Sequence, residues 1–139
     1  MNARAHSFLV GLALATGLAA GGAEARCLRY APTQVTLTGK LTQRTVPGPP
    51  NYLSVAQGDF PEMIIVLVLD EPICVTGNSS STPSSQSHSK VEEVQLVVEG
   101  SAHLSLIDKG VRATGTLSSA QTGHHRTPVL LTVKGLRAS

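Results

Sequence analysis

The chain has 139 residues, with 11 Lys and Arg against 9 Asp and Glu, a formal net charge of +2, and 3% aromatic residues. Proteins that bind nucleic acids present clustered basic charge and stacking aromatic side chains. This composition offers neither feature, so we expect no nucleic-acid partner.

The N-terminal 25 residues are predicted to be a secretory signal peptide. Arg4 precedes an apolar run that is too short to span a bilayer well, and Ala23-Glu24-Ala25 is a cleavage site of the A-x-A type. The sequence contains no second apolar run of membrane length. We therefore expect an exported single domain over residues 26–139, without a membrane span after signal cleavage.

Two cysteines, Cys27 and Cys74, remain in this domain. An even pair in an exported protein is most simply a disulfide. A loop of 47 residues closed in this way would stabilise the fold by about 4 kcal/mol in the chain-entropy model. A redox or metal-binding pair is the alternative, although the chain has no C-x-x-C motif.

Alternating apolar and polar residues predict a first strand over residues 34–46 and a fourth over residues 111–118. Both contain the pattern V-x-x-T-G-x-L, which places Gly39 and Gly115 in mid-strand. Glycine at such a position permits a bulge or a sharp bend. These two strands are therefore expected to curl, as the strands of a small barrel must.

A proline-rich loop over residues 47–61 follows the first strand. Its prolines exclude both a helix and a central strand. Tyr52 lies on this stiff loop. Two interpretations remain open: Tyr52 packs onto the barrel, or it belongs to a preformed recognition surface.

The second strand is predicted over residues 63–69, where the sequence is continuously apolar, and it resumes over residues 73–75. Asp70 and Glu71 separate the two parts; neighbours in an extended chain point to opposite faces, so they are poor acid–base partners. Residues 76–90 form a Ser-rich segment that cannot bury apolar surface and is predicted to be a mobile loop.

The third strand is predicted over residues 91–99, with Val94, Leu96 and Val98 facing inward and Gln95 facing outward. One or two helical turns are expected within residues 100–109. The fifth strand is predicted over residues 129–133 and is followed by a polar tail.

This order of elements predicts a mainly β protein: a small five-stranded OB-like Greek-key barrel with one short helix between strands three and four. An open five-stranded sandwich is the alternative, and the barrel is favoured because it leaves fewer exposed edges. OB-folds bind ligands between the loops that here are residues 47–61 and 121–128. Five residues are therefore predicted to lie near one another as a binding site: Asn51, Tyr52, His124, His125 and Arg126.

The second of these loops suggests three kinds of chemistry. Zinc or copper needs three or four ligands, of which His124 and His125 would supply two and His103 or a carboxylate another. Alternatively, protonated imidazole and Arg126 could bind an anion in a pH-sensitive way. Third, the side chains could simply lock neighbouring loops together. Hydrolysis is poorly supported, because no paired carboxylates and no activated Ser or Cys are present.

The chain also resembles a bacterial exported family of domains of unknown function, number 4431. The specific motifs are Gly48-Pro49-Pro50-Asn51-Tyr52 and Thr122-Gly123-His124-His125; generic strand motifs extend the resemblance over nearly all of residues 26–139. The family often has a third histidine where this chain has Arg126, which weakens a site of three consecutive imidazoles. The resemblance implies no established activity and places the protein in the periplasm or outside the cell.

Together these features predict a small exported, non-enzymatic binding or interaction module without a cofactor. Its partner would be an unknown protein or a small anionic ligand, held by the loops 47–61 and 121–128. The alternative is a periplasmic protein that handles zinc or copper through His124 and His125.

Overall fold

The computed structural model describes residues 26–77 and 86–139. The predicted signal peptide, residues 1–25, and residues 78–85 of the predicted Ser-rich loop lie outside this described part. One sheet of six strands dominates the fold, and the predicted mainly β class is confirmed. The elements are β1 (Leu28–Arg29), β2 (Gln34–Pro47), η1 (Val55–Gln57), β3 (Pro61–Thr76), β4 (His88–Val97), η2 (Ala102–Leu106), β5 (Gly110–Ser119) and β6 (Val129–Ala138).

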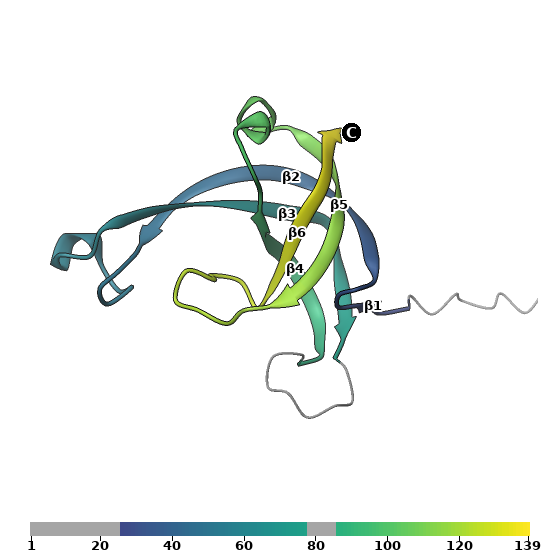
Figure 1. The fold of residues 1–139 in the computed structure, drawn as a ribbon, viewed down its shortest axis with the longest axis horizontal. Helices are drawn as coiled ribbons and strands as arrows, with labels where there is room; N and C mark the ends of the chain where they lie inside the picture. Colours follow the sequence, from purple (N-terminus) through teal and green to yellow (C-terminus); the bar gives the residue numbers. More distant parts are fainter. Residues whose placement is uncertain (1–25, 78–85) are drawn as a thin grey trace, which may run out of the picture.

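The strand pairings run in a ring. β2 pairs antiparallel with β3 and β5, β3 with β4, and β5 with β6. A short parallel ladder of three residue pairs between β4 and β6 completes the circuit (Figure 1). A ring of this kind is what the predicted barrel needs and an open sheet lacks. The short helix η2 lies between β4 and β5, where the sequence predicts it.

Alternate residues of the five long strands face a common core. Period-two side-chain direction puts every second residue of a strand on one side of the sheet. The fully buried aliphatic side chains of this core come from all five long strands: Leu41, Leu67, Val75, Val94, Val111, Ala113, Leu117, Val129 and Leu131. A small domain depends on such a cluster for most of its stability.

Gly39 and Gly115 are sites of close backbone approach. A Cβ atom at Gly39 would collide with the carbonyl oxygen of Val68, and one at Gly115 with that of Thr132. The β5–β6 register also shifts between Thr114 and Gly115. The structure therefore explains both mid-strand glycines by packing of neighbouring strands.

Three predicted element boundaries were wrong. β3 runs unbroken through Asp70 and Glu71, because a bulge between Val68 and Ile73 absorbs the polar residues. β4 begins at His88, which lies opposite Val75, so the Ser-rich loop is shorter than predicted. The predicted polar tail belongs to β6, since it continues to pair with β5.

The predicted disulfide is present. Cys27 and Cys74 are bonded, and their Cα atoms lie 4.6 Å apart. β1 pairs in parallel with the end of β3 at the same place, with Leu28 opposite Val75. The bond therefore ties the start of the described chain to the sheet. Among the described residues, no helix is long and apolar enough to cross a membrane.

The hairpin of β2 and β3 projects from the rest of the molecule (Figure 1). Residues 43–47 pair with residues 61–65, whereas β4 pairs with β3 only from Ile65 inward. We call residues 43–65 the arm. It carries the loop 47–61 and η1 at its end, beyond the ring of strands.

Candidate functional site: the contact between two loops

The loop at the end of the arm is organised around one buried carboxylate. Asp59 accepts hydrogen bonds from the backbone N–H groups of Asn51, Leu53 and Ser54, each at 2.8 Å. These donors, led by Ser54 and Leu53, stabilise the ionised form and lower the pKa of Asp59 below its usual value. Between them, Tyr52 adopts a left-handed backbone with φ of 58°. The carboxylate thus fixes the position of the Tyr52 side chain.

Gln95 anchors the second loop, residues 121–128, to β4. Its side-chain Nε2 donates to the carbonyl oxygen of His124 at 3.0 Å, and its Oε1 accepts from the backbone N–H of Arg126 at 2.6 Å. Its own N–H donates to Thr127 Oγ1 at 2.8 Å. The prediction that Gln95 faces solvent was wrong, because the loop folds back and buries it.

The two loops meet at the Tyr52 ring. Its hydroxyl lies 3.2 Å from His124 Nε2, and the two rings form an edge-to-face pair with centroids 5.4 Å apart. The guanidinium carbon of Arg126 lies 5.2 Å from the Tyr52 centroid, within cation–π range. A Cβ atom at Gly123 would lie 2.8 Å from Tyr52 Cζ, so only glycine permits this approach. We call this contact, made by Tyr52, Gly123, His124 and Arg126, the loop junction.

The loop junction extends to β3 through a charged partner. His124 Nδ1 lies 2.7 Å from Glu62 Oε1. A neutral imidazole donates from one nitrogen and accepts at the other. In the tautomer that satisfies both contacts, Nδ1–H donates to Glu62 and Nε2 accepts the Tyr52 hydroxyl. His124 therefore bridges the loop and the arm.

His125 does not join the loop junction. Its Nδ1 accepts the backbone N–H groups of Gln121 at 2.9 Å and Thr122 at 3.3 Å, so the ring closes its own loop. Asn51 contributes its backbone to the Asp59 network. Of the five predicted site residues, the structure brings together Tyr52, His124 and Arg126.

The two imidazoles also fail to form a shared metal site. Each Nδ1 already has a partner, and the two histidines use different partners. In residues 26–77 and 86–139, no group of three or more His, Cys, Asp or Glu side chains is placed to hold a metal ion. Zinc needs at least three protein ligands.

Three polar atoms at and beside the loop junction are buried without a hydrogen-bond partner among the residues that the structure describes. They are Glu62 Oε2 and the Nε and Nη2 atoms of Arg126. Unpaired buried charged groups are rare, because desolvation is then uncompensated. The loop junction and its surroundings therefore contain a carboxylate oxygen that accepts no hydrogen bond and guanidinium N–H groups that donate none.

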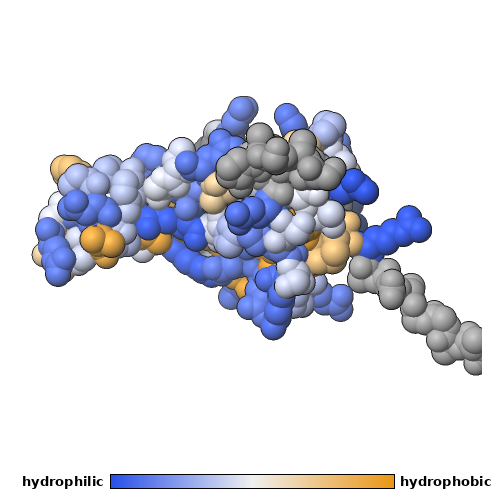
Figure 2. Space-filling view, turned by 90° about the horizontal axis from the view of Figure 1, so that it is seen from below, coloured by the Kyte–Doolittle hydropathy of each residue, from blue (hydrophilic) through white to orange (hydrophobic). Residues whose placement is uncertain are grey.

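Large apolar side chains are exposed on the loop of the arm. Leu53 is 77% exposed and Phe60 is 71% exposed, and Val55 of η1 is also exposed. Figure 2 shows apolar residues at the projecting end of the molecule, among hydrophilic neighbours. Grouped exposed apolar residues of this kind mark interaction surfaces.

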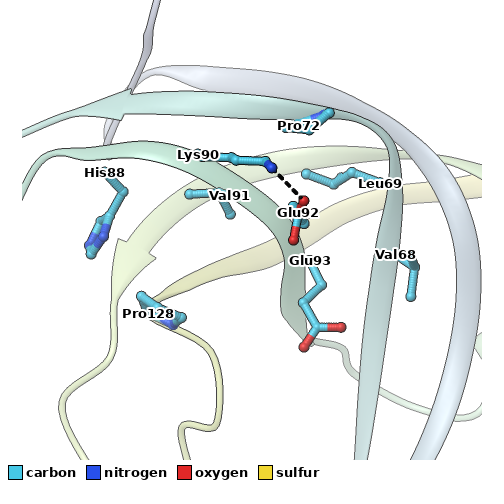
Figure 3. A pocket seen from close by; sticks show the side chains of 9 residues that line it. All are labelled: Val68, Leu69, Pro72, His88, Lys90, Val91, Glu92, Glu93 and Pro128. Carbon is cyan, nitrogen blue, oxygen red and sulfur yellow. Dashed lines mark ion pairs between the residues drawn. The ribbon is translucent and has the colours of Figure 1, made fainter.

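A hollow of about 680 Å³ lies away from the loop junction, beside the β3 bulge (Figure 3). Val68, Val91 and Pro128 contribute apolar surface. Its charged residues are already paired: Lys90 with Glu92 at 3.1 Å, and Glu93 with Arg44 at 2.7 Å. His88 also lines the hollow, and no ion pair joins it to Lys90, Glu92 or Glu93.

Comparison with known families identifies part of the chain. Residues 93–137 match the model described as Domain of unknown function (DUF4431). The match covers less than half of the chain and is a similarity of this segment to that family. The match supports the predicted resemblance over residues 93–137, and this DUF4431 segment contains Gln95, β5, the whole loop 121–128 and β6 up to Arg137. No curated protein matches the chain.

The DUF4431 segment supplies one side of the loop junction, and the arm supplies the other. Sequence reasoning missed Asp59, Glu62 and Gln95. Asp59 follows Gly58 in a Pro-rich loop, which is a weak turn signal. Glu62 and Gln95 act through partners 62 and 29 positions away, so no local pattern marks them.

Proposed function

We propose that this protein is a small exported, non-enzymatic binding module that uses the loops 47–61 and 121–128 to hold a partner. The observation that carries the proposal is the packing of Tyr52 against Gly123, His124 and Arg126, which joins two distant loops into one surface. A surface fixed before binding loses less conformational entropy on association.

Exposed apolar anchors support a protein partner. Leu53 and Phe60 extend from a loop whose backbone is held by Asp59, and apolar anchors of this kind carry much of the binding energy of interfaces. Arg126 offers the site for a small anion, since its Nε and Nη2 donate to no acceptor among the described residues. The disulfide and the predicted signal peptide support export to an oxidising compartment.

The hydrogen bonding of the site supports a binding role over a catalytic one. Asp59 is fully used by three backbone donors, and His125 Nδ1 by two. A general base must be free to take a proton from a substrate. The same use of imidazole nitrogens disfavours the metal-handling alternative.

Site-specific photocrosslinking in the cells that produce the protein tests the proposal. We would replace Leu53 or Phe60 with p-benzoylphenylalanine and, as a control, Thr36, which is exposed on β2 outside the arm. The proposal predicts a discrete cross-linked product from both loop positions and none from position 36. Products of equal yield at all three positions, or no product at any, would contradict it.

A further inference from the structure

A second surface feature adjoins the loop junction on the arm. A cleft of about 440 Å³ lies where β3 diverges from the end of β4, and η2 closes its far side. Its lining residues come from β2, β3, β4, η2 and the connection after β4. Those used below are Glu62, Met63, Ile65, Val97, His103 and Leu104.

The walls of the cleft are apolar and exposed. Met63 is 61% exposed, Leu104 is 53% exposed, and Val97 is also exposed. In the described part of the chain, every large apolar side chain that is strongly exposed lies either on the loop 47–61 or on this cleft. Because Met63 belongs to the arm, the cleft continues the apolar surface of that loop.

The charge of the cleft has one sign. Glu62 is the only Asp, Glu, Lys or Arg residue of its lining, and the neighbouring hollow carries one charge of each sign, Glu99 and Lys134. Residues 45–89 contain no Lys or Arg at all. Glu62 accepts from His124 at Oε1, and its Oε2 is buried with no hydrogen-bond partner among the described residues, although the side chain as a whole is 24% exposed. His103 Nδ1, in the same lining, also has no partner.

We infer that this cleft receives a segment of a partner protein in which an aliphatic or aromatic side chain stands next to Lys or Arg. The apolar side chain would pack between Met63 and Leu104, and the cationic group would approach the Glu62 carboxylate, the one charged group of the lining. Anionic lipid and nucleic acid do not fit, because both require clustered basic residues, and residues 45–89 contain no Lys or Arg. This inference rests on the proposed function only in taking the partner to be a protein.

Selection from a phage-displayed random peptide library on the oxidised domain, residues 26–139, tests the inference. We expect enriched peptides to pair an apolar residue with Lys or Arg. Their affinity should fall about tenfold or more for Met63→Asp and about threefold or more for Glu62→Gln. Thr36→Asp, which adds the same charge as the first variant on the far part of β2, should bind like the parent.

Two further variants keep the result interpretable. Leu104→Asp repeats the test on η2 in case Met63→Asp disturbs the arm, and thermal unfolding establishes that each variant is folded. Asp70→Asn removes an exposed β3 carboxylate outside the cleft, as the matched control for Glu62→Gln; it should retain peptide binding within about twofold.

The outcomes distinguish the inference about the cleft from the proposed function of the loops 47–61 and 121–128. Enriched peptides that contain acidic residues, or whose binding ignores both Met63→Asp and Leu104→Asp, would overturn the inference. If such peptides instead lose binding in Leu53→Asp and Phe60→Asp, the proposed function of the loops stands without it. An absence of any enriched peptide overturns the inference, and the crosslinking experiment then decides the proposed function by itself.

Discussion

At the residue scale, the position of one aromatic ring decides how the two loops relate. Asp59 holds the backbone on both sides of Tyr52, through the N–H groups of Asn51 and Leu53. The Tyr52 ring contacts Gly123, His124 and Arg126. Each contact is worth little by itself in an exposed setting. The close approach at Gly123 is the least replaceable of them, because a Cβ atom there meets the ring directly.

Gly123→Ala should therefore separate the loops. The added methyl group lies 2.8 Å from Tyr52 Cζ, and overpacking of this kind costs about 1–3 kcal/mol. Urea unfolding measures the change in the free energy of unfolding. Gly135→Ala is the matched control, since a Cβ atom there has no neighbour within 4 Å. Equal stability of the two variants would argue against the contact with Tyr52.

Asp59 gives the arm a dependence on pH. Its folded-state pKa lies below the usual value near 3.8, so the ionised form stabilises the fold fully above that pH and less as pH falls through the folded-state pKa. Asp59→Asn should lower stability at pH 7, and the difference from the parent should shrink below about pH 4. Chemical unfolding at pH 7 and pH 3 tests this, with Asp70→Asn on exposed β3 as control. A difference that stays constant with pH would refute the role of the carboxylate.

At the element scale, alternation in the sequence predicts the strands well, because one face of each is packed on the core. Val94 and Leu96 are buried as expected. Prediction fails where a distant segment covers the other face: Gln95 looks like a solvent-facing residue until the loop 121–128 folds over it. Prediction also fails at the end of β6, which continues into a polar sequence. Its backbone pairs with β5, and this pairing needs no apolar side chains.

Gln95 should govern the order of the loop 121–128. In Gln95→Leu both side-chain hydrogen bonds to the loop are lost, and each contributes about 1 kcal/mol. The amide of Arg126 should then exchange with deuterium about tenfold faster or more, as followed by NMR. Gln43→Leu, a change of the same type at an exposed position of β2, should leave this rate unaltered. Unchanged exchange in Gln95→Leu would show that the loop is held by other contacts.

At the scale of the whole molecule, the sequence specified the class of fold and the disulfide, and it indicated which two loops to examine. The combination of five strands, a helix after the third and two mid-strand glycines was sufficient for this. The sequence did not predict the contacts within the site. The side chain of Glu62, the burial of Gln95 and the divergence of His125 from His124 all depend on contacts between segments far apart in sequence.

The disulfide should be a major source of stability for so small a domain. Cys27 and Cys74 close a loop with a sequence separation of 47, which corresponds to about 4 kcal/mol in the chain-entropy model. The double variant Cys27→Ala, Cys74→Ala should lose roughly that free energy of unfolding in urea. Added reductant should destabilise the parent and have no effect on the variant. Equal stability of the oxidised and reduced parent would contradict the assignment.

The central claim is that the loops 47–61 and 121–128 form one surface before any partner binds. Nuclear Overhauser effects between the Tyr52 ring and the Gly123 Hα and His124 ring protons, measured on the free oxidised protein, test it most directly. The structure predicts strong effects to the Gly123 Hα protons, because a Cβ atom built on Gly123 would lie 2.8 Å from Tyr52 Cζ. It also predicts strong effects to His124, whose Nε2 is 3.2 Å from the Tyr52 hydroxyl. Their absence, together with random-coil shifts for residues 122–126, would show that the loops are independent in solution and would remove the basis of the proposed binding surface.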